Sequence, residues 1–94
     1  MNLTMPMTSI KLIDGTFTPE EAENVLLKLL DSKIKFHALE SFSSQIRGGE
    51  ENQHSKQRVA ELVDATESVR ELVKQAKERN LKFSIQSNIS IELL

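Results

Sequence analysis

The feature that most constrains this chain is an apolar stripe within residues 54–80. Its members recur every three or four residues, which places them on one face of a helix: Val59, Leu62, Val63, Val69, Leu72, Val73 and Ala76. A helix from about Glu51 to Asn80 would be about 45 Å long at 1.5 Å per residue. A stripe of that length needs cover, so we expect the rest of the 94-residue chain to pack against it.

Both ends of this long helix carry residues that suit it. Glu50 and Glu51 stand at its start, and basic residues including Lys77 and Arg79 stand at its end, which is the order that the helix dipole favours. Asn80 follows as a helix C-cap, because asparagine tolerates the left-handed backbone conformation that closes many helices.

A second helix is predicted to start at Thr18-Pro19-Glu20-Glu21. Thr18 is the cap, Pro19 suits the first helical position, and Glu21 completes a capping box. Phe17, just before the cap, is positioned to pack on Ala22. We expect this helix to run to about Asp31, with one buried face: Ala22, Val25, Leu26, Leu29 and Leu30.

Alternating apolar and polar residues predict strands elsewhere. Ser9–Ile13 forms one, with Ile10 and Leu12 on the same face, and Asp14-Gly15 then marks a turn. Lys33–Leu39 forms a second, and the last dozen residues form a third with one apolar face: Phe83, Ile85, Ile89 and Ile91. Residues 42–46 fit either a further weak strand or a loop.

The wholly polar outer face of the last strand decides the predicted architecture. Parallel sheets that are covered on both faces have nearly continuous apolar strands instead. We therefore expect an α+β or α/β two-layer sandwich of order β-α-β-(β)-α-β, in which both helices cover one face of a three- or four-stranded sheet. With the optional strand the order is that of the ferredoxin-like split arrangement; without it, the sheet is three-stranded and largely parallel.

Composition limits the classes of protein that fit. The length indicates one domain over 1–94, with 1–8 frayed and 41–53 a polar connection. The chain has no cysteine, which excludes disulfides and thiolate metal sites, and its net charge of −2 is evenly spread, so nucleic acid is a poor partner. With no apolar run of membrane-spanning length, we expect a soluble cytoplasmic protein that does not bind membranes.

The densest polar stretch, residues 41–58, holds most of the candidate binding residues. They are Arg47, His54, Lys56 and Arg58, around the flexible Gly48-Gly49 pair. The competing interpretation is a solvated connection without a ligand. His37, placed on the outward face of the second strand, completes the set as a lone imidazole that either has a role or is simply exposed.

No catalytic motif, cofactor motif or metal-ligand pattern is present in the sequence, so we expect a non-enzymatic protein-interaction or self-association module without a cofactor. The partner is a second copy in a homodimer, or another protein. The homodimer forms either through the strand Lys82–Leu94 or through the helix stripe Val59–Ala76. The alternatives are a small-ligand or nucleic-acid binder that uses residues 41–58, and an enzyme that uses His37 or His54 as acid–base.

Overall fold

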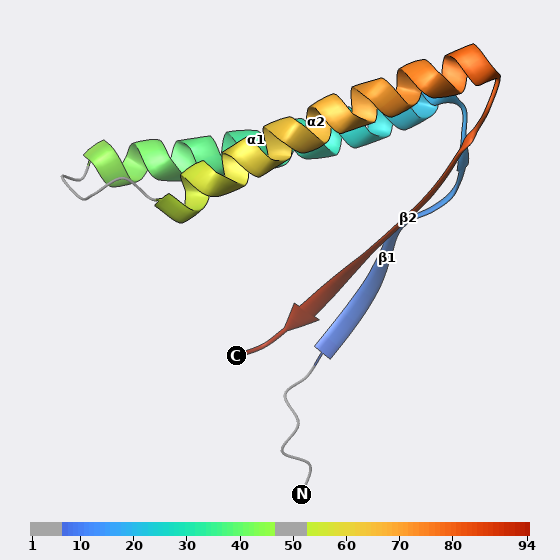
Figure 1. The fold of residues 1–94 in the computed structure, drawn as a ribbon. Coiled ribbons are helices and arrows are strands. Elements are labelled where there is room, and N and C mark those ends of the chain that lie inside the picture. Colours follow the sequence, from blue (N-terminus) through green and yellow to red (C-terminus); the bar gives the residue numbers. More distant parts are fainter. Residues whose placement is uncertain (1–6, 47–52) are drawn as a thin grey trace, which may run out of the picture.

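The computed structural model describes residues 7–46 and 53–94 (Figure 1). Its elements, in chain order, are strand β1 (Met7–Phe17), helix α1 (Pro19–Ile46), helix α2 (Gln53–Arg79) and strand β2 (Phe83–Glu92). The two helices lie side by side as a helical hairpin, and the two strands pair antiparallel as a ribbon. The fold is therefore α+β with a two-stranded sheet, and the prediction of a sheet with three or four strands is wrong.

The excess predicted strands are all part of α1. This helix has 28 residues and continues through Lys33–Leu39 and residues 42–46, both of which we had considered as strands. Asp31-Ser32-Lys33 contains no glycine or proline, so nothing stops the helix there. The polar connection expected over 41–53 is likewise helical up to Ile46 and again from Gln53, and residues 47–52 lie outside the described part of the chain.

The period-two pattern in Lys33–Leu39 has a helical explanation. In a helix, Ile34 and His37 fall on one side and Phe36 and Leu39 on another. Ile34 and His37 are half-buried, whereas Phe36 is 56% exposed and Leu39 is 65% exposed. A short run of alternating residues is therefore also what a helix with two apolar sides produces.

The start of α1 confirms the predicted capping box. Glu21 N–H donates to Thr18 Oγ1 at 3.2 Å, and Thr18 N–H donates to Glu21 Oε1 at 2.9 Å. These two hydrogen bonds satisfy backbone donors that the first turn leaves without helical partners. Ala22, in the next turn, is completely buried.

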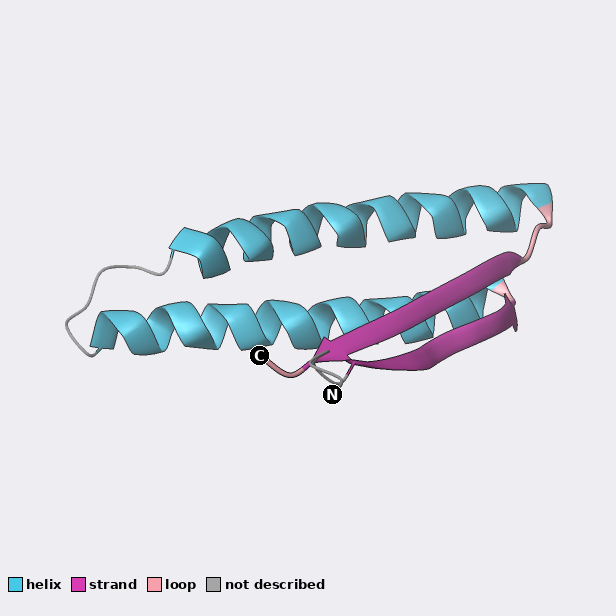
Figure 2. Ribbon diagram, turned by 90° about the horizontal axis from the view of Figure 1, so that it is seen from below, coloured by secondary structure: helices cyan, strands magenta, loops and turns pink. Residues whose placement is uncertain are grey.

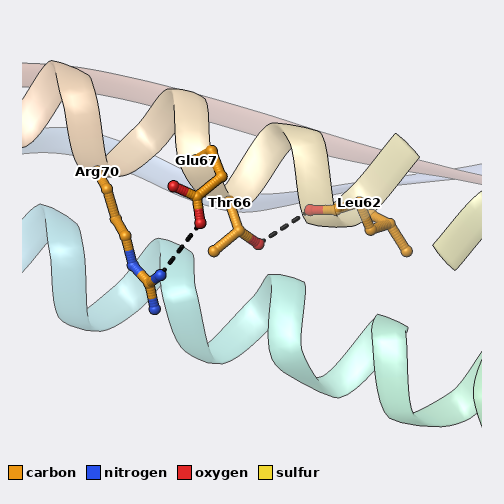
Figure 3. A network of polar contacts seen from close by, with 4 residues as sticks. All are labelled: Leu62, Thr66, Glu67 and Arg70. Carbon is orange, nitrogen blue, oxygen red and sulfur yellow. Dashed lines mark hydrogen bonds and ion pairs between the residues drawn. The ribbon is translucent and has the colours of Figure 1, made fainter. Parts of the chain in front are cut away.

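Helix α2 confirms the predicted long amphipathic helix. Leu62, Val73 and Ala76 are buried in the seam that α2 forms with α1. Thr66 lies in the same seam and donates its hydroxyl to the Leu62 carbonyl at 2.9 Å, as Figure 3 shows. This hydrogen bond to the carbonyl four residues earlier gives the hydroxyl an acceptor at a position that is partly removed from water.

The predicted cap at Asn80 is also confirmed. Its φ of 53° is left-handed, Asn80 N–H donates to the Lys77 carbonyl at 3.4 Å, and Leu81 N–H donates to the Ala76 carbonyl at 2.8 Å. This pair of bonds is the Schellman ending, which satisfies carbonyls of the last turn. It directs the chain straight from α2 into β2.

The ribbon contains a β-bulge that gives it one apolar face. Leu12 has no partner in the register, so Lys11 pairs with Asn88 while Ile13 pairs with Ser87. The extra residue reverses the alternation of β1. One face, called here the ribbon face, therefore carries most of the apolar residues: Thr8, Ile10, Ile13, Gly15, Phe17, Phe83, Ile85, Ser87, Ile89 and Ile91.

Two expectations for β1 are corrected by this register. Ile10 shares its face with Ile13 rather than with Leu12, because the bulge lies between them. Asp14 and Gly15 are not a turn but continue the strand opposite Gln86 and Ile85. On the opposite, polar face, Lys11 Nζ lies 3.4 Å from the Asp14 carboxylate.

The helical hairpin and the ribbon form an open V. They meet where β1 enters α1 and where α2 leaves for β2, and they diverge from that end (Figures 1 and 2). The extents are 49 × 45 × 14 Å and the radius of gyration is 17.4 Å, against about 12 Å for a compact domain of this length. The predicted closed sandwich is thus not formed within one chain.

Burial along the ribbon face follows the V. Ile85, near the joined end, is 9% exposed, and α1 contacts both strands there. Ile89 and Ile91, farther out, are 38% and 45% exposed. The prediction that the whole apolar face of β2 belongs to the core is therefore wrong for its outer half.

Replacing Thr18 by alanine removes the hydroxyl that accepts from Glu21 N–H. We expect Thr18→Ala to lower the free energy of unfolding by about 1 kcal/mol. Urea denaturation followed by circular dichroism measures this loss. Thr16→Ala, on the exposed polar face of the ribbon, is the matched control. Equal effects of the two substitutions would show that the capping box does not stabilise the chain.

The capping box also predicts a pH dependence. Hydrogen bonds from the backbone and hydroxyl of Thr18, with a smaller effect of the Lys82 charge, lower the pKa of Glu21 below its ordinary value of 4.5. The stabilisation is therefore present above pH 4.5 and is lost as the pH falls through the lowered pKa. We expect Glu21→Gln to weaken the acid-induced loss of stability between pH 5 and pH 3, measured by urea denaturation. Glu20→Gln leaves the Thr18–Glu21 hydrogen bonds in place and should keep the acid-induced loss of stability. Equal dependence of stability on pH in both variants would contradict the assignment of this loss to Glu21.

Candidate interaction surface

His37 lies in α1 and points into the helical hairpin, not outward from a strand as predicted. Its side chain is 12% exposed. Nδ1 is buried without a hydrogen-bond partner in the described structure, and the nearest carboxylate oxygen, on Glu40, is 3.8 Å away. The Phe36 ring contacts the imidazole edge-on, with 5.2 Å between ring centroids. His37 is thus chiefly a packing residue of the seam.

Among the described residues, His54 is the predicted site residue that the structure brings to His37. It lies in the first turn of α2, and the two imidazole centroids are 6.4 Å apart at an interplanar angle of 84°. The pairing follows from the hairpin, because the last turns of α1 face the first turns of α2. Sequence reasoning missed it because it placed His37 on a strand.

The other predicted site residues are placed only in part by the structure. Arg47 lies outside the described residues. Lys56 is exposed on α2, and Arg58 forms an ion pair with Glu61 one turn along the same helix. Within 7–46 and 53–94, no group of three or more histidine, aspartate or glutamate side chains is arranged to hold a metal ion.

Two cavities between described residues lie away from the histidine pair. A cavity of about 500 Å³ lies at the joined end, where Pro19 meets Ala76 and Leu81. Another, of about 240 Å³, lies between α1 and α2 beside Ile34 and Thr66. Neither of these two cavities is lined by His37 or His54.

The outer half of the ribbon face is an unusual exposed surface. It comprises Thr8, Ile10, Ile89 and Ile91, and the three isoleucines are 43%, 38% and 45% exposed in that order. Cross-strand pairing puts Ile10 opposite Ile89 and Thr8 opposite Ile91, which makes the patch continuous. No charged residue lies on this face of the ribbon.

Helix α1 carries a second exposed apolar strip, which we call the outer stripe. Its members are spaced four, three, four and three residues apart: Val25, Leu29, Ser32, Phe36 and Leu39. Leu29 is 39% exposed, and Phe36 and Leu39 are more exposed still. The seam with α2 uses a different side of the helix, so the outer stripe remains uncovered within the chain.

The chain exposes more total surface than a compact monomer of its mass. The chain exposes 7407 Å², whereas a compact monomer of 10.6 kDa exposes about 5,500 Å². Its buried apolar residues are few among the described ones: Ala22, Leu62, Val73, Ala76 and Ile85. Exposed apolar patches of this extent are typical of interaction sites rather than of isolated monomers.

Comparisons with known proteins assign the chain to no group: no family model, no curated protein sequence and no solved structure matches it. Neither described helix is apolar over a stretch long enough to cross a bilayer. The surfaces of this chain are therefore the basis for its proposed function.

The packing role of His37 can be tested against His54. We expect His37→Ala to lower the free energy of unfolding by roughly 1–3 kcal/mol, because the imidazole fills the seam. His54→Ala, at an exposed position, should cost about 0.5 kcal/mol or less. Urea denaturation of both variants measures the difference, and a larger loss for His54→Ala would contradict this placement.

Proposed function

We propose that this protein is a non-enzymatic self-association module whose working form is a homodimer. The observation that supports it most is the imbalance between its small core and its exposed apolar surface. Burying a large aliphatic or aromatic side chain contributes about 1.5–3 kcal/mol, so leaving many of them in water forfeits much of the stability available to a small domain.

The shape of the chain supports an association role. The flat V has two arms that diverge from their joined end. A surplus of about 1,900 Å² per chain over a compact monomer exceeds the roughly 800 Å² that each partner contributes to a standard interface. A partner chain that covers the arms would recover apolar burial that the fold itself does not provide.

The alternative, a ligand or nucleic-acid binder acting through residues 41–58, has less support. Of the described cations in this segment, Arg58 is paired with Glu61, and the net charge of the chain is −2. The residues that define the exposed surfaces are mainly apolar, with Lys33 Nζ 4.9 Å from the Phe36 ring as a neighbouring cation, and mainly apolar surfaces suit a protein partner rather than phosphate groups.

Self-association is measured by light scattering coupled to size-exclusion chromatography over a hundredfold range of concentration. We expect the mass of two chains, about twice 10.6 kDa, at the upper end, with dissociation toward one chain on dilution. A monomer mass throughout would defeat the proposal, and thermal shifts with nucleotides or short oligonucleotides would then favour the ligand-binding alternative.

A further inference from the structure

We propose that a second copy of the chain docks on the outer stripe of α1 and on the outer half of the ribbon face. In this dimer, the outer stripe of each copy covers the outer half of the ribbon face of the other copy. This inference rests on the proposed self-association and adds its surface and its arrangement. Each copy then supplies one helical and one ribbon surface, as a twofold dimer requires.

The chemistry of the two surfaces is complementary. The ribbon face offers branched aliphatic side chains at Ile10, Ile89 and Ile91, and the outer stripe offers Leu29, Phe36 and Leu39. A helix stripe on one face of a sheet is the ordinary way for these elements to bury each other. At the joined end the chain already packs in this way, because Ile85 is buried where α1 contacts the ribbon.

The V explains why the cover comes from another copy. Within one chain the two arms diverge, so the outer stripe and the outer half of the ribbon face have no cover of their own. The residues that define the two surfaces are uncharged, with Lys33 Nζ as a neighbouring cation 4.9 Å from the centre of the Phe36 ring, and a net charge of −2 per chain opposes association only weakly. The helix stripe considered from the sequence is only partly available, because Leu62, Val73 and Ala76 are buried while Val63 and Leu72 are 44% and 52% exposed.

The bulge at Leu12 brings most of the apolar residues of both strands to one face of the ribbon, which supports burial of that face in the dimer. Without the extra residue, Ile10 would lie on the polar side with Ser90 and Asn88. With it, Ile10 joins Ile13 and the isoleucines of β2. A bulge also makes β1 an irregular edge that pairs poorly with further strands. The ribbon therefore offers a face rather than an edge on this side.

A matched pair of lysine substitutions tests the surface. Ile89→Lys places a charge on the ribbon face, whereas Ser90→Lys places the same charge one residue on, on the polar face. We expect Ile89→Lys to raise the dimer dissociation constant at least tenfold and Ser90→Lys to change it less than threefold, by light scattering. Circular dichroism checks that both fold. A dimer equally strong in both variants would overturn the inference while leaving self-association intact.

Single cysteines test the arrangement, because the natural chain has none. Ser32→Cys lies in the outer stripe, Thr8→Cys on the ribbon face, and Ser9→Cys beside it on the polar face. Copies carrying Ser32→Cys are mixed with copies carrying either of the others, refolded together from urea and oxidised. Every disulfide between the two kinds of copy is then intermolecular.

We expect a disulfide, or a link by a short bismaleimide, between Ser32→Cys and Thr8→Cys and much less with Ser9→Cys. Linking of Thr8→Cys copies only to each other would indicate ribbon-to-ribbon packing and overturn the inference. A dimer that forms no link between positions 32 and 8 would also overturn the proposed arrangement. A monomer mass for the unsubstituted chain would instead contradict self-association itself.

Discussion

The packing of α1 against α2 is the interaction on which the rest of the structure depends. Its buried members are mostly small or medium-sized, including Ala22, Leu62, Val73 and Ala76, and the part-buried Thr66 bonds back to its own helix. Small side chains allow two long helices to approach closely along their length. This seam sets where both strands leave the hairpin, and so it makes the antiparallel ribbon possible.

The ribbon by contrast is tethered to the hairpin at one end. The capping box of α1 and the Schellman ending of α2 fix the two chain exits side by side. Beyond them, backbone pairing holds β1 to β2, but two strands alone are marginally stable in water. The burial of Ile85 secures only the near half. The exposed far half is the physical reason to infer a partner chain.

Local signals in the sequence predicted much of this fold. The stripe of α2, the Thr18–Glu21 cap, Asn80 and the last strand each depend on neighbouring residues, and each was found. The continuation of α1 was missed because its two apolar sides imitate a strand over Lys33–Leu39. Testing the helical period from Ala22 onward would have shown Val25, Leu29, Phe36 and Leu39 in one line. The bulge and the V depend on tertiary pairing that no local pattern encodes.

The candidate surface was predictable only in part. Excess apolar area was inferred from the long stripe. The seam covers only part of that stripe, since Val63 and Leu72 stay exposed, and further uncovered apolar surface lies on α1 and the ribbon. The contact between His37 and His54 could not be predicted once His37 was assigned to a strand.

Contacts between copies can be observed directly by an isotope-filtered nuclear Overhauser experiment on a mixture of labelled and unlabelled chains. Four phenylalanines are the only aromatic residues besides histidine, which makes the ring protons easy to assign. The account predicts intermolecular contacts from the Ile89 and Ile91 methyls of one copy to the Phe36 ring of another. A dimer whose Ile89 and Ile91 methyls show no contact with that ring would contradict it.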